Sequence, residues 1–216
     1  MIKQLDELLR AYLARDPAAR SRLEVLLLYP GVTAVIYHRM AHWLYRHKLK
    51  FPARVLSQWS RFLTGIEIHP GAKIGRRLVI DHGSGIVIGE TAEIGDDVLL
   101  YQGCTLGGTG KERGKRHPTV GNHVMIGCGA KVLGGITIGD HSRIAAGAVV
   151  LRNVPPESTA VGVPARIARI AGRKPAAEMD QIHIEDPVQT ELEALREKLN
   201  VMEKKLEEKE NHHVSL

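Results

Sequence analysis

The chain of 216 residues has few aromatic side chains, few cysteines and no long apolar run. Its two cysteines, Cys104 and Cys128, are too few for a disulfide scaffold and suit a reducing cytoplasm. No apolar run approaches the ~20 residues that a membrane span needs, and Asp6 and Glu7 near the start disfavour a secretory signal. The sequence therefore predicts a cytoplasmic protein with no membrane partner.

Aromatic residues, glycines and charges are unevenly distributed. Eight of the nine aromatics precede Gly65, whereas 20 of the 22 glycines lie between Gly65 and Gly162. These differences divide the chain into a head, a middle region and a tail, at 1–64, 65–170 and 171–216. Their net charges are +7, +3 and −4. A basic head can bind nucleic acid, but the sequence shows no base-reading motif, so we interpret it as a solvated surface.

The head is expected to be helical. Apolar residues at helical spacing predict a first helix within 5–13. Asp16-Pro17 joins a capping residue to a proline suited to a first helical turn, so a second helix is expected to begin there. The breakers that follow predict two more helices, over 32–47 and 52–65.

The middle region carries an aliphatic residue at every sixth position, in three blocks separated by a two-residue slip and a longer gap. Such a repeat indicates a parallel β-helix, in which three hexads make one triangular coil of about 18 residues. Each side is a short strand whose aliphatic side chain fills a narrow interior, where large aromatic rings would not fit. The positions are Ile68, Ile74, Ile80, Ile86, Ile94, Leu100, Leu106, Val120, Ile126, Val132, Ile138, Ile144 and Val150.

Two further segments stand out. Between Leu106 and Val120 the repeat is interrupted by a Gly-rich, basic loop (107–118), and such insertions usually carry function. In the tail, a helix over about 188–210 is expected to form a coiled coil with symmetry mates or to pack on the chain's own head. Its apolar seam consists of Leu192, Leu195, Leu199, Met202 and Leu206.

Several residues capable of acid–base chemistry cluster in the coil sequence. Glu67 and His82 are 15 positions apart, which in coils of about 18 residues places them one rung apart. A carboxylate can fix the tautomer of a histidine and favour its protonated form, as in acid–base catalysis. A solvated surface histidine is the alternative. The full candidate set is Glu67, His69, Asp81, His82, Glu90, Arg116, His117 and His123.

An ordered set of motifs resembles the serine O-acetyltransferases of the hexapeptide-repeat acyltransferase family. The motifs are IHPGAKIG (68–75), DHGSGIVIGET (81–91), TLGGTGK (105–111), KRHP (115–118) and VGVPAR (161–166). The resemblance covers about residues 10–170, Arg15-Asp16-Pro17 included. It implies an α+β fold, with an N-terminal helical domain followed by a left-handed parallel β-helix and a C-terminal coiled-coil-like helix.

The resemblance also implies a reaction, which is acetyl transfer from acetyl-CoA to the L-serine hydroxyl at the start of cysteine biosynthesis. His82 would remove the hydroxyl proton, since serine is a poor nucleophile at neutral pH. Glu67 stands where many members have Asp in the catalytic dyad. His117 matches a second active-site histidine that contacts substrate.

Further roles follow from the same resemblance. Asp16 and Asp81 match positions that hold the serine ammonium, and Arg116 matches the position that holds its carboxylate. Glu90 is expected to be a structural partner in the pocket wall. The residues expected to bind acetyl-CoA are Gly108, Thr109, Gly127, Cys128 and Ala146. Cys128 stands where members often have Ala and is expected to be a packing residue, and no metal is expected.

Two other functions use the same fold. A gamma-type carbonic anhydrase would hold zinc with three histidines, for which His82, His117 and His123 have suitable spacing. A non-catalytic scaffold would use the tail to recruit a partner. The acetyltransferase is favoured because the full motif set fits it.

Assembly and regulation are also implied by the resemblance. Members are commonly homotrimers, and a hexamer is the alternative here. L-Cysteine is expected to inhibit by mimicking serine. Cysteine synthase is a possible partner through the C-terminus, which here ends in Val214-Ser215-Leu216 rather than in the usual Ile.

Overall fold

A computed structural model describes residues 2–110, 113–168, 192 and 195–203. The described residues up to 168 belong to one compact unit, and residues 192 and 195–203 belong to a second. Within these described ranges, no helix has both the length and the apolar character that crossing a membrane requires.

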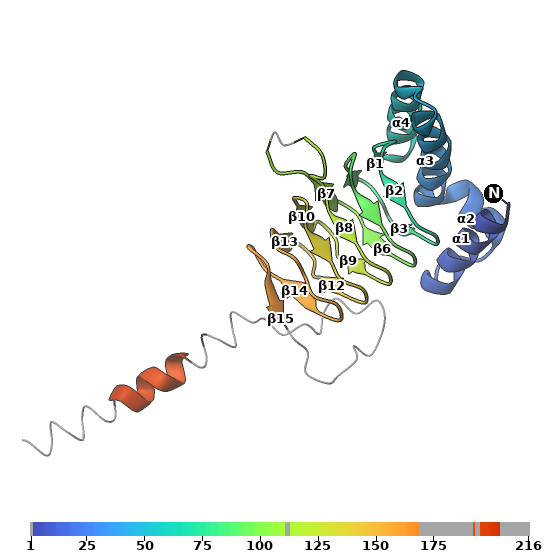
Figure 1. Cartoon of the computed structure of the whole chain (residues 1–216). Coiled ribbons are helices and arrows are strands. Elements are labelled where there is room, and N and C mark those ends of the chain that lie inside the picture. The colour runs from blue at the N-terminus through green and yellow to red at the C-terminus, as the bar shows by residue number, and fades with distance from the viewer. Residues whose placement is uncertain (1, 111–112, 169–191, 193–194, 204–216) are drawn as a thin grey trace, which may run out of the picture. The chain divides into compact units, whose positions relative to one another are not determined.

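The head consists of four helices, which lie at one end of the β-structure (Figure 1). They are α1 (Ile2–Arg15), α2 (Arg22–Leu28), α3 (Pro30–Arg46) and α4 (Lys50–Thr64). The phenol of Tyr12 on α1 connects the head to the β-structure, because it accepts a hydrogen bond from the Ile80 N–H and donates to the Ile80 carbonyl. The head is therefore positioned against the first coil.

The second helix begins at Arg22, so the prediction that it starts at Asp16-Pro17 is wrong. Ser21 caps it, with its Oγ accepting from the N–H of Glu24 at 3.2 Å. Asp16 instead follows the end of α1, where its Oδ1 accepts from the N–H of Ala18 at 2.8 Å. This hydrogen bond makes a turn, which competes with the helical cap that the sequence suggested.

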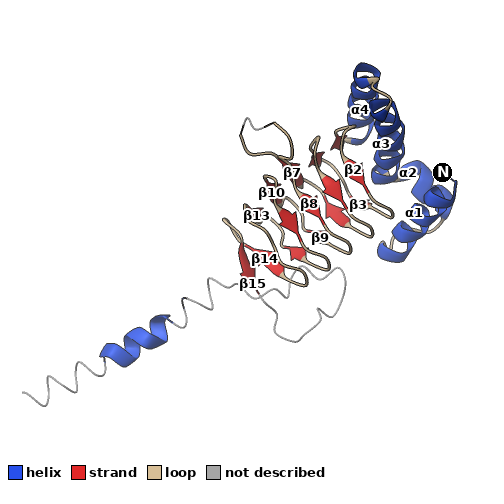
Figure 2. Ribbon diagram, in the orientation of Figure 1, coloured by secondary structure: helices blue, strands red, loops and turns tan. Residues whose placement is uncertain are grey.

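Short strands form three sheets, one for each side of a triangular coil (Figure 2). The first sheet contains β1 (Glu67–Ile68), β4 (Val87–Ile88), β7 (Thr105–Gly107), β10 (Lys131–Leu133) and β13 (Val149–Val150). The second contains β2 (Lys73–Ile74), β5 (Glu93–Ile94), β8 (Thr119–Val120) and β11 (Thr137–Ile138). The third contains β3 (Val79–Asp81), β6 (Leu99–Tyr101), β9 (Met125–Ile126), β12 (Arg143–Ile144), β14 (Thr159–Val161) and β15 (Arg166–Ala168). All neighbours pair in parallel except β14 and β15.

The interior of the coils is aliphatic, as predicted. Leu100, Ile126 and Ile144 come from successive rungs of the third sheet and are fully buried. Cys104 is also buried, which raises the pKa of its thiol to about 11. The predicted parallel β-helix is confirmed.

The first coil contains 20 residues, because Ile68 pairs with Ile88. A regular coil contains 18, as between Val132 and Val150. The predicted slip after Ile86 is therefore wrong, since the two extra residues lie before Ile88. Ile86 is as deeply buried as Ile88, so hydrophobicity alone did not distinguish the two positions. The longer corner is the one that contains His82.

The loop prediction is confirmed by the register. Leu106 pairs with Val132, so this coil contains 26 residues, eight more than a regular one. In the second unit, residues 195–203 are helical, and Leu195, Leu199 and Met202 of the predicted seam are exposed. The remainder of the expected 188–210 helix, apart from Leu192, lies outside the described residues, as does the C-terminal end at 214–216.

Candidate active site

Most candidate site residues of the coil fall at two of its corners, at opposite ends of the strands of the first sheet. Asp16 lies in the head, Glu67 on β1 and His123 at the third corner. We call the corner before these strands the His82 corner (81–85, 102–103, 127–129 and 145–147), whose rungs are joined by main-chain hydrogen bonds. We call the corner after them the Arg116 corner (69–71, 89–91, 108–109 and 116–118). One side of the triangle separates the corners by on the order of 10 Å.

His82 is exposed at the top of its corner. Its backbone has a φ of 59°, in the left-handed region, within the two-residue extension of the first coil. Its Nε2 lies 3.8 Å from Oδ1 of Asp81, beyond hydrogen-bond distance. The imidazole is thus open to an incoming hydroxyl.

The predicted contact between Glu67 and His82 stays a prediction, since the structure places a different partner beside Glu67. Its Oε2 lies 3.3 Å from Nη1 of Arg61, and no hydrogen bond or ion pair joins Glu67 to His82 within the described residues. The longer first coil changes the offset on which the dyad prediction relied. The carboxylate expected to orient the base is therefore engaged by a cation of α4.

Two carboxylates near His82, those of Asp16 and Asp81, lie close enough for their charges to interact. Oδ2 of Asp16 accepts a hydrogen bond of 2.6 Å from the Tyr29 hydroxyl, and this bond raises the pKa of Tyr29 to about 12. Burial raises the pKa of Asp81, and the negative charge of Asp16 adds to the effect. A cation bound at this pair would relieve their repulsion, which suits an ammonium group.

At the Arg116 corner, the guanidinium is held by the carboxylate of Glu90. Nη2 of Arg116 lies 2.5 Å from Oε2 of Glu90, while Oε1 of Glu90 accepts from the Tyr45 hydroxyl at 2.8 Å. The hydrogen bonds from Arg116 and then Tyr45 lower the pKa of Glu90. Glu90 therefore has the structural position that the sequence predicted, and it aligns a cation able to bind a carboxylate.

His117 is buried beside Arg116. The ring Nδ1 lies 3.2 Å from the Thr91 N–H and 2.9 Å from Thr91 Oγ1. The same Oγ1 accepts from the main-chain N–H groups of Arg116 and His117 at 3.0 and 3.1 Å. Sequence reasoning missed Thr91 although it lies in a motif, and it missed Tyr29 and Tyr45, for which the sequence carries no signal beyond their place in the helical head.

The residues expected to bind acetyl-CoA divide between the same corners. Cys128 and Ala146 lie on adjacent rungs of the His82 corner, half-buried and exposed respectively. Gly127 must be small there, since a Cβ would lie 2.6 Å from the Ala146 nitrogen. Gly108 and Thr109 lie at the Arg116 corner, where a Cβ on Gly108 would be 3.5 Å from Nε2 of His117.

The three histidines of the zinc alternative lie at three different corners. His123 belongs to the third corner, where its Nε2 is 3.9 Å from Oδ2 of Asp97 and its ring stacks on His141 at 4.7 Å. His82 and His117 lie at the other two. One chain therefore does not bring these three ligands around a single ion.

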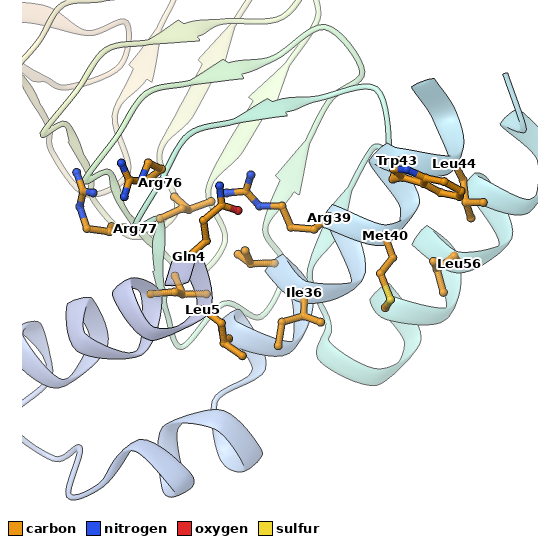
Figure 3. A pocket seen from close by; sticks show the side chains of 13 residues that line it. Gln4, Leu5, Ile36, Arg39, Met40, Trp43, Leu44, Leu56, Arg76 and Arg77 are labelled. Carbon is orange, nitrogen blue, oxygen red and sulfur yellow. The ribbon is translucent and has the colours of Figure 1, made fainter. Parts of the chain in front are cut away.

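An apolar groove of about 720 Å³ lies among α1, α3, α4 and the first coil (Figure 3). Leu5, Met40 and Trp43 line it, and Arg76 and Arg77 lie at one edge (Figure 3). None of the predicted site residues lines this groove. Its apolar lining does not suit a small zwitterion, so it is separate from the candidate active site.

Comparisons with known proteins agree with this fold. The model for bacterial transferase hexapeptide repeats (six repeats) matches residues 117–152. The chain is 51% identical over 199 residues to a serine acetyltransferase of Staphylococcus aureus, covering 92% of this chain and 93% of that one. It is 51% identical over 208 residues to a serine acetyltransferase of Bacillus licheniformis, covering 96% of each.

Solved structures give the same result. The serine acetyltransferase of Neisseria gonorrhoeae superposes with a TM-score of 0.79 and 42% identity, over 84% of this chain and 70% of that one. Family structures in complex with serine, cysteine and coenzyme A match with TM-scores of 0.75, 0.76 and 0.75. Their identities are 42%, 45% and 45%, over 78%, 78% and 77% of this chain and 69%, 70% and 66% of theirs. The chain belongs to the serine acetyltransferase family.

Proposed function

We propose that this protein transfers acetyl from acetyl-CoA to the hydroxyl of L-serine, giving O-acetyl-L-serine and CoA. The proposal is carried by one arrangement of side chains. An exposed His82 lies beside two carboxylates, Asp16 and Asp81, that suit an ammonium group, and Arg116 at the other corner suits a carboxylate. These groups match the three functional groups of serine, and the family membership supports the same substrate.

The chemistry follows from these positions. His82 takes the hydroxyl proton as the serine oxygen attacks the thioester carbonyl. The new C–O bond forms, the C–S bond breaks, and the proton passes from His82 to the departing CoA sulfur. Asp16 and Asp81 hold the ammonium and Arg116 the carboxylate, which fixes the hydroxyl at the imidazole.

We infer that two copies complete each site. His82 and Arg116 lie at opposite ends of one set of strands, so one chain presents two half-sites that face different directions. In a homotrimer, the His82 corner of one copy would meet the Arg116 corner of the next, and acetyl-CoA would lie between them. Cys128 and Ala146 would then line one wall, and Gly108 and Thr109 the other.

The test is thiol release from acetyl-CoA by purified protein with L-serine, L-homoserine, a galactoside or no acceptor. Release that depends on L-serine and is lost in His82→Ala supports the reaction and its base. Folded protein that releases no thiol with L-serine would contradict the proposal. Mass measurement of the native protein tests the trimer, for which a monomer or dimer would be the contradicting result.

Inhibition by L-cysteine is the regulatory part of the proposal. L-Cysteine carries the ammonium and carboxylate of serine, and a family member at 45% identity has been solved with cysteine bound. We expect inhibition that is competitive with serine. Inhibition that serine does not relieve would contradict a shared pocket. Recruitment of cysteine synthase is tested by a pulldown with and without the last ten residues.

A further inference from the structure

We propose that Thr91 is a positioning residue that fixes His117 as the Nε2–H tautomer, so that His117 acts as a neutral hydrogen-bond donor to a substrate oxygen. The proposal rests on the function proposed above, and it gives the second histidine of the site a role distinct from that of His82.

The tautomer follows from the donors around Nδ1. A main-chain N–H can only donate, and the N–H of Thr91 points at Nδ1 from 3.2 Å. Nδ1 must therefore carry a lone pair and no proton. In a neutral imidazole the remaining proton is then on Nε2.

The hydroxyl of Thr91 acts in the same direction. Its oxygen accepts from the N–H groups of Arg116 and His117, at 3.0 and 3.1 Å, so its lone pairs are occupied. Its own hydrogen is left to donate to Nδ1, which lies 2.9 Å away. Thr91 thus holds the C-terminal end of the loop at Arg116 and also fixes the ring of His117.

The surroundings keep the ring neutral. Burial lowers the pKa of His117, and the cations Arg116 and Lys115 add to this, while the Glu90 carboxylate opposes it. His69 also faces this cluster, and its own pKa is lowered by burial. A protonated ring would place a hydrogen on Nδ1 against two donors from Thr91.

The ring position leaves Nε2–H for a ligand. The His117 ring lies against Gly89, where any side chain would overlap it, and a Cβ on Gly108, at the start of the loop, would lie 3.5 Å from Nε2. Among the residues that the structure describes, no protein group hydrogen-bonds Nε2. The donor therefore lies beside the carboxylate-binding Arg116, at the wall expected to contact acetyl-CoA.

The first experiment reads the tautomer directly. Nitrogen-15 NMR of histidine-labelled full-length protein, with His117 assigned by comparison with His117→Asn, should show a protonated Nε2 and an unprotonated Nδ1 at neutral pH. A protonated Nδ1, or a doubly protonated ring at neutral pH, would overturn the proposal. This readout does not depend on activity, so it separates failure of this inference from failure of the proposed function.

The second experiment compares Thr91→Val with Thr91→Ser. Valine keeps the shape and loses the hydroxyl, and we expect kcat/KM for L-serine to fall about 10- to 100-fold with a raised pKa of His117. Serine restores the hydroxyl and should return kcat/KM to within about threefold of wild type. Thr119→Val, on β8 just after the loop, is the matched control and should leave both readouts unchanged.

Two outcomes contradict the role of Thr91. Either Thr91→Val behaves like Thr119→Val in both readouts, or Thr91→Ser is as impaired as Thr91→Val. If Thr91→Val does not fold, two measurements still decide whether Thr91 positions His117. They are the comparison of Thr91→Ser with wild type and the His117 tautomer of the wild-type protein. An Nε2–H tautomer in a protein that releases no thiol with serine would sustain the positioning inference and refute the substrate.

Discussion

The His82 corner and the Arg116 corner are built in opposite ways. His82 is exposed, and the carboxylate that faces it, through Oδ1 of Asp81, lies 3.8 Å from its Nε2. Arg116 and His117 are held by Glu90 and Thr91 through hydrogen bonds of 2.5 to 3.2 Å. The difference suits the roles proposed for these residues, since a base must exchange a proton with substrate, whereas a binding group gains from being fixed beforehand.

The two corners also bear on the proposal that two copies share each site. Under the proposed function each corner would bind part of serine and part of acetyl-CoA, and the strands of the first sheet keep the two corners apart. A rigid β-helix cannot fold these corners together. In the proposed trimer, one copy's open corner would pair with another copy's pre-organised corner and complete the site.

Loss of the base should have the largest effect. Replacing His82 by alanine removes the proton acceptor, and we expect kcat for serine acetylation to fall about 10²- to 10⁴-fold. His141→Ala, at the third corner, is the control and should retain wild-type rates in the thiol-release assay. Comparable losses in both variants would mean that histidine substitution acts through the fold.

Loss of the carboxylate-binding cation should have the next largest effect. Arg116→Ala removes a charge-assisted contact, and we expect KM for L-serine to rise about 10- to 100-fold, with a smaller change in the KM for acetyl-CoA. Arg113→Ala, in the exposed part of the same loop, is the control. A rise confined to the acetyl-CoA KM would reassign Arg116 to the other substrate.

Crowding of His117 should give a more moderate loss. Alanine at position 89 would overlap the imidazole and push it from the corner, so we expect kcat/KM for serine to fall about tenfold. Gly71→Ala, whose added Cβ meets its neighbours at 3.1 to 3.2 Å, should cost less. Equal rates for Gly89→Ala and wild type would show that the ring position is not used.

The pH dependence of stability should show the smallest effect. The folded protein holds His38, His69 and His117 at lowered pKa values, in each case chiefly through burial, so below the ordinary value of about 6.5 the unfolded chain binds more protons. The free energy of unfolding should therefore decrease as the pH falls from 7.5 to 5.5, by at most about 1.4 kcal/mol per pH unit for each histidine.

Urea unfolding at both pH values and at fixed protein concentration measures this decrease. His117→Asn should show a smaller decrease than wild type, because one of the three histidines no longer titrates. An identical decrease in both proteins would mean that the buried ring does not resist protonation.

Much of the architecture was predictable because the six-residue repeat directly reflects which side chains are buried. Aliphatic side chains at every sixth position are all buried when the chain winds into a β-helix. The 107–118 insertion is visible as a break in that period. The boundary of α2 was missed because Asp16 serves a turn as readily as a helix cap. The slip was misplaced because Ile86 and Ile88 are both buried.

The candidate site was predictable in its residues and less so in its contacts. Motif resemblance supplied His82, Asp81, Arg116 and His117. The partners that orient them, Thr91, Tyr29 and Tyr45, come from other rungs or from the helical head, and only the three-dimensional packing reveals them. Spacing could not reveal that Glu67 contacts Arg61, since that contact depends on the direction of α4.

Mixing two impaired variants tests whether each active site is shared between copies of the chain. His82→Ala and Arg116→Ala, co-expressed in equal amounts and assayed at low serine, form trimers in which about one site in four combines an intact His82 corner with an intact Arg116 corner. The account predicts recovery of about a quarter of the wild-type activity, far above either variant alone. Activity no greater than the mean of the two single variants would contradict a site shared between copies.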